Sequence, residues 1–243
     1  MKPIVMRLVA AACLAGAASA RADNGELAKL QDEFQRAQQK FFEEYQAGGE
    51  YDAKKHPAVE FMPRFRAFAE ANAGKPEAIQ ALLWIMQSSG MTGQDKALSM
   101  NTARWALKQL EENHLADAGL AGAVPQMRHL AWQIGGERLA AFYEKVIKKN
   151  PSDEAKASAM FNLADIKHDA DEAKAAEKLL RTIVSDYPTT KAAEQAGRFI
   201  FEIEHLQIGM KAPDFVGEDV HGNEIKLSQF HGNVVVIDFW GFW

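Results

Sequence analysis

Cysteine is almost missing from this sequence, because Cys13 is the only one among 243 residues. Long hydrophobic runs are missing as well. A helix needs about 20 consecutive apolar residues to cross a bilayer, and the longest apolar stretch, residues 8–18, falls well short of that length. These two absences exclude a disulfide framework and predict no membrane span, so the chain has to be held together by packing.

Sequence motifs for the common catalytic chemistries are also absent. There is no G-x-S-x-G, no glycine-rich phosphate loop and no H-E-x-x-H, so hydrolase, kinase and metalloprotease readings have no support. None of the seven histidines has metal-ligand spacing, and we expect each of them to lie in solvent: His56, His114, His129, His168, His205, His221 and His231. The sequence therefore predicts neither a metal site nor a cofactor.

The first 22 residues have the features of a secretory signal peptide. Lys2 and Arg7 precede the apolar stretch, and Ala18-Ser19-Ala20 follows it as a cleavage site of the A-x-A type. We therefore expect export to the periplasm or cell envelope. Loss of Lys2 and Arg7 would take the formal charge from −5 to −7, and such an acidic surface disfavours nucleic acid as a partner.

Residues 23–206 have the apolar spacing of amphipathic helices, and this predicts a helical domain. A stripe of apolar residues at helical spacing is followed by Gly48-Gly49, which should end the first helix. Pro76 should lie in the first turn of a later helix. Aromatic residues at such spacing usually bury area between helices, so the tryptophans of this region are expected in or near the core. The stripe consists of Leu27, Leu30, Phe34, Phe41 and Tyr45, and the tryptophans are Trp84, Trp105 and Trp132.

An internal repeat lies within this helical region. The segment 143–151 aligns with the segment 180–188; each ends in proline and precedes an alanine-rich helix, with Ala155 and Ala159 matching Ala192 and Ala196. This pattern resembles the tetratricopeptide (TPR) design, in which small residues let paired helices approach closely. The resemblance implies a TPR-like helical stack and a possible groove for a protein or peptide partner.

After residue 206 the pattern changes. Gly222-Asn223 predicts a turn between two short strands, Leu227-Ser228 predicts one turn of helix, and Val234–Phe239 is a continuous apolar run typical of a buried strand. Three motifs within 209–243 resemble, in the same order and spacing, those of the TlpA and redoxin families of thioredoxin-like proteins. The positions that carry the resemblance are Gly209, Ala212, Pro213, Asp214, Phe215, Gly222 and Gly232, followed by the Asp-Phe-Trp run that begins at Asp238.

The resemblance implies a mostly α protein, with a TPR-like domain over 23–206 followed by the N-terminal part of an α/β thioredoxin-like domain over 207–243. In these families a catalytic Cys-x-x-Cys would begin directly after Trp243, so no catalytic residue is present in this chain. Asp238 resembles a buried proton acceptor beside the site, with Trp240 packed in the core and Trp243 beside the substrate surface. Burial raises a carboxyl pKa and would suit proton transfer at Asp238.

The resemblance implies an exported thiol-disulfide oxidoreductase that acts on protein thiols or disulfides and lacks its cysteines here. Two alternatives stay open: a peroxiredoxin-like antioxidant, and a non-enzymatic helical scaffold or protein-binding module with a vestigial tail. We further hypothesise that the codon after Trp243 is UGA, read as selenocysteine, because a selenol is already ionised at neutral pH. A fragment end or a true terminus is the alternative to that hypothesis.

Overall fold

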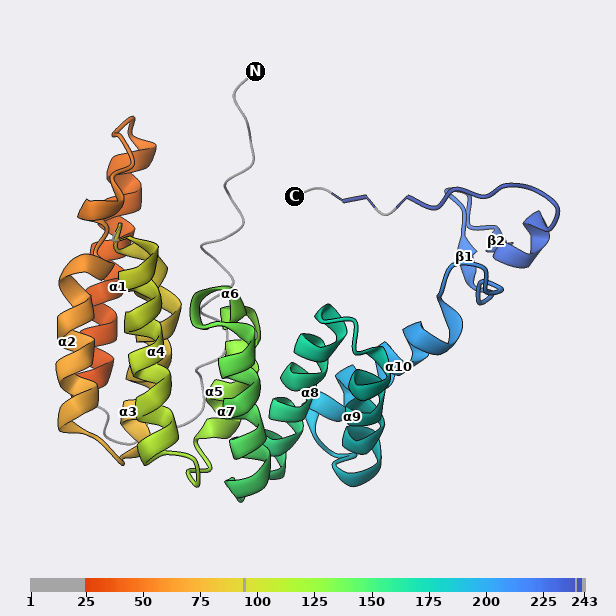
Figure 1. Cartoon of the computed structure of the whole chain (residues 1–243). Coiled ribbons are helices and arrows are strands. Elements are labelled where there is room, and N and C mark those ends of the chain that lie inside the picture. Colours follow the sequence, from red (N-terminus) through yellow and green to blue (C-terminus); the bar gives the residue numbers. More distant parts are fainter. Residues whose placement is uncertain (1–24, 94, 239, 242–243) are drawn as a thin grey trace.

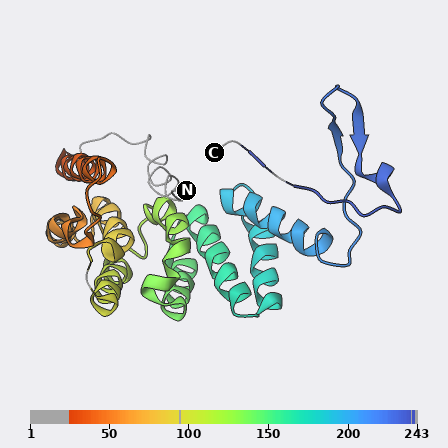
Figure 2. The ribbon, with the colours of Figure 1, turned by 90° about the horizontal axis from the view of Figure 1, so that it is seen from above.

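The chain is a curved row of helices followed by one small hairpin (Figure 1). The structure is a computed structural model, and it describes residues 25–93, 95–238, 240 and 241. The predicted signal peptide and Trp243 therefore lie outside the described residues. Within the described part the chain is mostly α-helical, as the sequence predicts. Seen from above, successive helices follow one another along an arc, with α1 at one end and α10 at the other (Figure 2).

The helices differ in length, and several short ones fall in the middle of the chain. The first four are α1 (Gly25–Gln46), α2 (Ala58–Ala71), α3 (Pro76–Ser88) and α4 (Lys96–Asn113), with the 3₁₀ turns η1 (Ala53–Lys55) and η2 (Ser89–Met91) among them. The middle of the chain contains α5 (Leu120–Ala123), η3 (Val124–Leu130) and α6 (Ala131–Ile134). The last four are α7 (Gly136–Lys149), α8 (Asp153–Asp169), α9 (Ala173–Asp186) and α10 (Lys191–His205).

Local signals in the sequence account for many of the helix ends. Pro76 is the first residue of α3, where its missing N–H costs nothing, and Gly74 before it has a φ of +80° that favours glycine. Helix α4 begins where the Asp95 carboxylate accepts a hydrogen bond of 2.9 Å from the Leu98 N–H. Ser152 and Thr190 cap α8 and α10 in the same manner. Helix α1 ends at Gln46, just before the predicted stop at Gly48.

The larger of two hydrophobic cores runs from α1 to α8. At its N-terminal end the Phe65 ring, which is fully buried, stacks on Trp84 with 3.8 Å between ring centroids and 13° between planes. Phe34 meets the same indole edge-on at 4.9 Å. Trp105 is partly buried against this core, so the expectation for Trp84 and Trp105 is confirmed.

Trp132 was expected in or near the core, and that expectation is wrong. Its side chain is 66% exposed although α6 lies between buried segments. The ring rests on Gly90, where a Cβ would come within 3.1 Å of it, and the rest of the indole faces solvent. Helical spacing places Trp132 on one face of α6. Because α6 is a single short turn, the neighbouring helices leave most of the Trp132 side chain uncovered.

The smaller core is built from α8, α9 and α10, which are three of the four helices, α7 to α10, that the predicted repeat covers. Helix α8 packs against α7 and α9, and α10 packs against α9. Ala155, Ala159, Ala192 and Ala196 are all buried, so these small residues lie where neighbouring helices meet, as the repeat implies. Ile147 and Leu179 pack against both cores and join them.

Two histidines contradict the expectation that all seven lie in solvent. His114 is 1% exposed, and neither ring nitrogen has a hydrogen-bond partner among the described residues, although Nδ1 lies 3.6 Å from the Asp117 carboxylate. His56 is 2% exposed and its Nδ1 accepts a hydrogen bond of 3.1 Å from the Ala58 N–H at the start of α2. Burial of these histidines depends on tertiary packing. Their exposure was expected because they lack metal-ligand spacing, and such spacing carries no information about packing.

The burial of His56 makes the stability of the helical part depend on pH. Its ring packs edge-on against Phe41 at 5.2 Å, and burial lowers its pKa below the usual 6.5. Because the folded state disfavours the proton, this contribution to stability is complete above pH 6.5 and is lost as the pH falls through the lower folded pKa. We expect the thermal midpoint to drop between pH 7 and pH 5.

The control variant is His56→Asn, since asparagine can still accept from the Ala58 N–H but does not titrate. It should show a clearly smaller drop in midpoint over the same pH range, measured by circular dichroism. If both proteins lose the same number of degrees, the pH dependence comes from other groups.

Candidate functional site

The segment that resembles thioredoxin-like proteins contains one antiparallel hairpin. Strand β1 (Val216–Glu218) pairs with β2 (Glu224–Lys226), with Gly217 opposite Ile225. The turn is shaped by Asp219, whose carboxylate accepts hydrogen bonds from the His221 and Asn223 N–H groups, both at 2.8 Å. Gly222 has a φ of +81°, which favours glycine at this position. The predicted turn at Gly222-Asn223 is therefore confirmed.

Asp214 of the A-P-D-F motif lies just before the hairpin, and its side chain holds this position to the helical turn that follows the hairpin. Its carboxylate accepts hydrogen bonds from the Ser228 N–H at 2.9 Å and from the Ser228 hydroxyl at 2.7 Å, and so begins the 3₁₀ turn η4 (Leu227–Phe230). The Ser228 hydroxyl, then its N–H, hold the pKa of Asp214 below its usual 3.8. Two motifs that lie apart in sequence are thus joined, and the predicted turn of helix at Leu227-Ser228 is present.

The two hydrogen bonds from Ser228 to Asp214 act as a staple between the start of the hairpin and η4. A variant that lacks them should lose order at η4. Asp214→Ala should speed amide hydrogen exchange at Ser228 and shift the NMR signals of η4, while the helices stay unchanged. Because the folded pKa is lowered, the staple in the unaltered chain should hold above pH 3.8 and open as the pH falls through the lower folded value. Glu218→Ala, on the exposed β1, is the matched control and should leave the exchange of Ser228 as it was. Equal exchange in both variants would contradict the role given to Asp214.

The apolar run that follows does not form the predicted central strand. The described residues 234–238 are not in a strand, and the expectation of burial on both faces is wrong for them. Val234 and Val236 are 96% and 87% exposed. A central strand needs hydrogen-bonded neighbours on both sides, and in the described part of the chain β1 and β2 pair only with each other.

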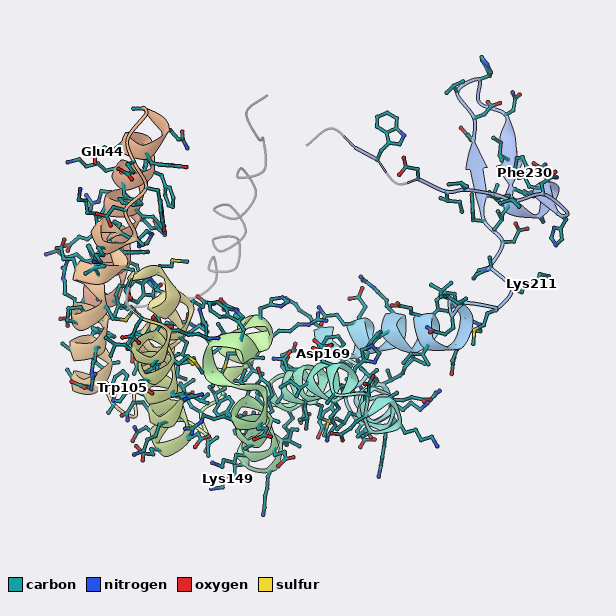
Figure 3. All side chains as sticks on the ribbon, turned by 45° about the horizontal axis from the view of Figure 1, so that its top comes forward. Glu44, Trp105, Lys149, Asp169, Lys211 and Phe230 are labelled. Atoms are coloured by element: carbon teal, nitrogen blue, oxygen red, sulfur yellow. The ribbon has the colours of Figure 1, made fainter. Side chains whose placement is uncertain are left out.

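The predicted site residues do not come together around a cavity. Asp238 is exposed rather than buried, and Trp240 is 75% exposed rather than in a core. Gly209, Ala212 and Pro213 lie in the exposed connection between α10 and β1, and Gly232 follows η4 in the chain. Figure 3 shows Lys211 and Phe230 on this segment, beyond the helices that carry Trp105 and Asp169. Trp243 lies outside the described residues.

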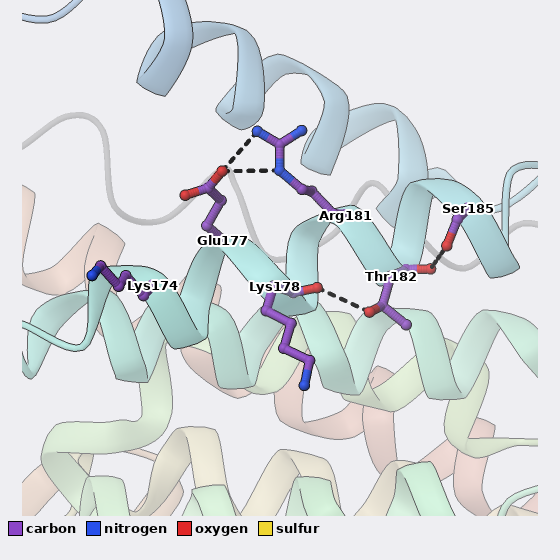
Figure 4. Close-up of a pocket in the computed structure, with 6 residues that line it drawn as sticks. All are labelled: Lys174, Glu177, Lys178, Arg181, Thr182 and Ser185. Carbon is purple, nitrogen blue, oxygen red and sulfur yellow. Dashed lines mark hydrogen bonds and ion pairs between the residues drawn. The ribbon is translucent and has the colours of Figure 1, made fainter.

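The described ranges contain no cluster of three or more histidine, cysteine or acidic side chains that could hold a metal, and none of their helices is long and apolar enough to cross a membrane. A shallow depression along α9 is lined by Lys174, Glu177, Lys178, Arg181, Thr182 and Ser185 (Figure 4). Its Arg181 guanidinium is paired with Glu177 and Glu204, each at 2.7 Å. These exposed ion pairs describe a solvated helix face rather than a reactive site.

Known proteins similar to this chain match a short part of it. A stretch of 45 residues is 42% identical to the thiol-disulfide oxidoreductase ResA of Bacillus anthracis and to that of Geobacillus kaustophilus (strain HTA426). A stretch of 40 residues is 45% identical to ResA of Bacillus cereus (strain ATCC 10987 / NRS 248). The matches cover 16–18% of this chain and 23–26% of the relatives, so the chain spans about a quarter of the length of the curated relatives it matches. No family model and no solved structure matches the chain. Over that stretch the chain is similar to thiol-disulfide oxidoreductases.

Proposed function

We propose that this chain is an exported thiol-disulfide oxidoreductase of the TlpA or redoxin type that acts on the dithiols or disulfides of other proteins. The observation that carries the proposal is the identity of 40–45% to ResA over 40–45 residues. The staple between Asp214 and Ser228 supports it, because it joins two motifs of the segment 207–243 in one small fold. Residues 1–22 act as the signal peptide in this proposal, and 23–206 form a separate helical domain.

The proposed chemistry needs a nucleophile that follows Trp243. Its thiolate or selenolate would attack one sulfur of a substrate disulfide, form a mixed disulfide and release the other substrate sulfur as a thiolate. A second thiol of the same site would then attack the nucleophile's sulfur or selenium in the mixed bond, form an internal disulfide or selenenyl sulfide, and release the second substrate sulfur as a thiolate; dithiothreitol would reduce the internal bond again. Asp238, placed before the site, would accept the proton of that second thiol. After removal of residues 1–22 no cysteine is left in this chain, so it supplies the frame of the site and not its nucleophile.

The test compares this chain with a chain extended through the reading frame that follows the Trp243 codon. In the reduction of insulin by dithiothreitol, we expect the 243-residue chain to give the uncatalysed rate and the extended chain to accelerate precipitation. The nucleotides after Trp243 should encode selenocysteine or cysteine and then the rest of a thioredoxin-like domain. Acceleration by the 243-residue chain would contradict the missing nucleophile, and faster peroxide consumption than insulin reduction would favour the peroxiredoxin-like alternative.

A second candidate function is a helical scaffold or protein-binding module. It is favoured by the two hydrophobic cores, whose buried residues run from Leu27 to Ala196 and include none from the hairpin, within the part of the chain that the structure describes. The helices therefore form their hydrophobic cores without any residue of the segment 207–243. The lack of any thioredoxin-like frame beyond Trp243 would favour this function over the first.

A further inference from the structure

A polar cleft lies in the helical part, between η3, α8 and α10, and it includes no residue of the segment 207–243. Its volume is about 200 Å³, which suits a single amino-acid residue rather than a folded partner. The side chains around it come from three segments that are separated in sequence: Pro125, Arg128, His129, Ser158, Phe161, Asn162 and Gln195. Helix α8 connects the other two segments, since it packs against both η3 and α10.

Two of the polar side chains of the cleft are buried in the fold. Ser158 and Asn162 are only 5% and 4% exposed, and the Asn162 amide donates a hydrogen bond of 2.8 Å to the Val124 carbonyl, which fixes its orientation. Neither Ser158 nor Gln195 makes a side-chain hydrogen bond to another residue in the described part of the chain. A hydroxyl and an amide each offer one donor and one acceptor or more, so they match the N–H and C=O of a peptide unit.

The positive charge of Arg128 at the cleft is already compensated within the protein. Arg128 donates two hydrogen bonds to the Asp165 carboxylate, one of them at 3.1 Å from Nη2, and its guanidinium lies 5.1 Å above the Phe161 ring. An anionic ligand would have to compete with Asp165 for this cation. The cleft therefore favours a neutral ligand; Phe161 is only 6% exposed and lies beneath Arg128, so the exposed Pro125 is the apolar side chain left for contact.

We propose that this cleft binds one residue of an extended, uncharged peptide segment of a partner protein. The main-chain amides on either side of that residue would bond to Ser158 and Gln195, and its small side chain would rest against Pro125. The inference rests on the helical part as a protein-binding module, and it holds whether or not the segment 207–243 takes part in thiol chemistry.

The probe is N-acetyl-alanine methylamide, which has one small side chain between two uncharged amides. It is titrated into the isotope-labelled full chain, below the concentration at which the chain aggregates, and followed by NMR. We expect saturable shifts confined to the cleft, including the side-chain amides of Asn162 and Gln195. Ser158→Ala and Gln195→Ala should each weaken binding about fivefold, as for the loss of one neutral hydrogen bond. Gln35→Ala, at an exposed glutamine of α1, is the matched control and should bind like the unaltered chain.

Both test positions tolerate the change, since Gln195 is exposed and Ser158→Ala removes a single oxygen; circular dichroism checks that each variant is folded. Failure of the probe to shift these signals would overturn the proposal, and so would unchanged affinity in both variants. Tighter binding of N-acetyl-alanine with its free carboxylate, or of inorganic phosphate, would show an anion site instead. None of these outcomes depends on a nucleophile after Trp243, so failure here is distinct from failure of the proposed redox function.

Discussion

Replacing Phe65 with alanine should lower the free energy of unfolding of the helical part by about 3–5 kcal/mol, the usual cost of truncating a buried aromatic side chain. The ring is fully buried and lies between Trp84, on which it stacks, and Phe34, which it meets edge-on at 6.4 Å. Its loss would leave a cavity where α1, α2 and α3 meet, and would remove an aromatic pair worth about 1 kcal/mol beyond its buried area.

The measurement is denaturant unfolding followed by circular dichroism and by the fluorescence of the tryptophans. Val59→Ala is the matched control, because Val59 lies on the same helix and is 39% exposed. It should change the free energy of unfolding by no more than about 0.5 kcal/mol. Similar losses in the two variants would show that the stack of Phe65 on Trp84 does not hold this end of the molecule.

The second large effect concerns the segment after α10. A chain shortened to end at Leu206 should stay in solution and keep its helices, whereas the 243-residue chain should aggregate as its concentration rises or be cleaved near Gly209. Val234 and Val236 are almost fully exposed, and an apolar extended run without paired neighbours is a template for association between chains. Light scattering and limited proteolysis of the two chains test this expectation.

A variant of the full chain tests whether aggregation is caused by the apolar run itself rather than by the added length of the segment. Lysine at both Val234 and Val236 should suppress aggregation, because charge on an exposed edge opposes strand pairing. Lysine at both Val59 and Val184, each 39% exposed on a helix, adds the same charge and should not suppress it. Equal solubility and equal protease resistance of the shortened and full chains would mean that the segment docks on the helices.

Features set by neighbours in sequence could be predicted from the sequence alone. Pro76 and Gly74 mark a helix start and end, and Gly222-Asn223 marks the turn, because each acts through its own backbone dihedral angles. The buried alanines of α8 and α10 followed from the alignment of two segments within the chain. In such cases the physical cause lies within a few residues of the feature.

Features set by packing could not be predicted in this way. The burial of His56 and the exposure of Trp132 depend on which neighbouring layer covers them, and single-helix spacing says nothing about that. The run 234–238 has the composition of a central strand, yet strand formation requires hydrogen-bonded partners that the described part of the chain does not bring to it. The cleft residues Ser158 and Gln195 belong to no motif and meet only because α8 and α10 pack together.

The two hydrophobic cores also bear on how the molecule comes apart. In a linear array each unit contacts only its neighbours, so cooperativity is transmitted through the interfaces between units rather than through one centre. Here Ile147 and Leu179 are the side chains common to both cores. Helix α8 contributes buried side chains to both cores as well. We therefore expect α9 and α10 to open as one unit while α1 to α8 stay closed, with Ile147, Leu179 and α8 setting how strongly the two parts are coupled.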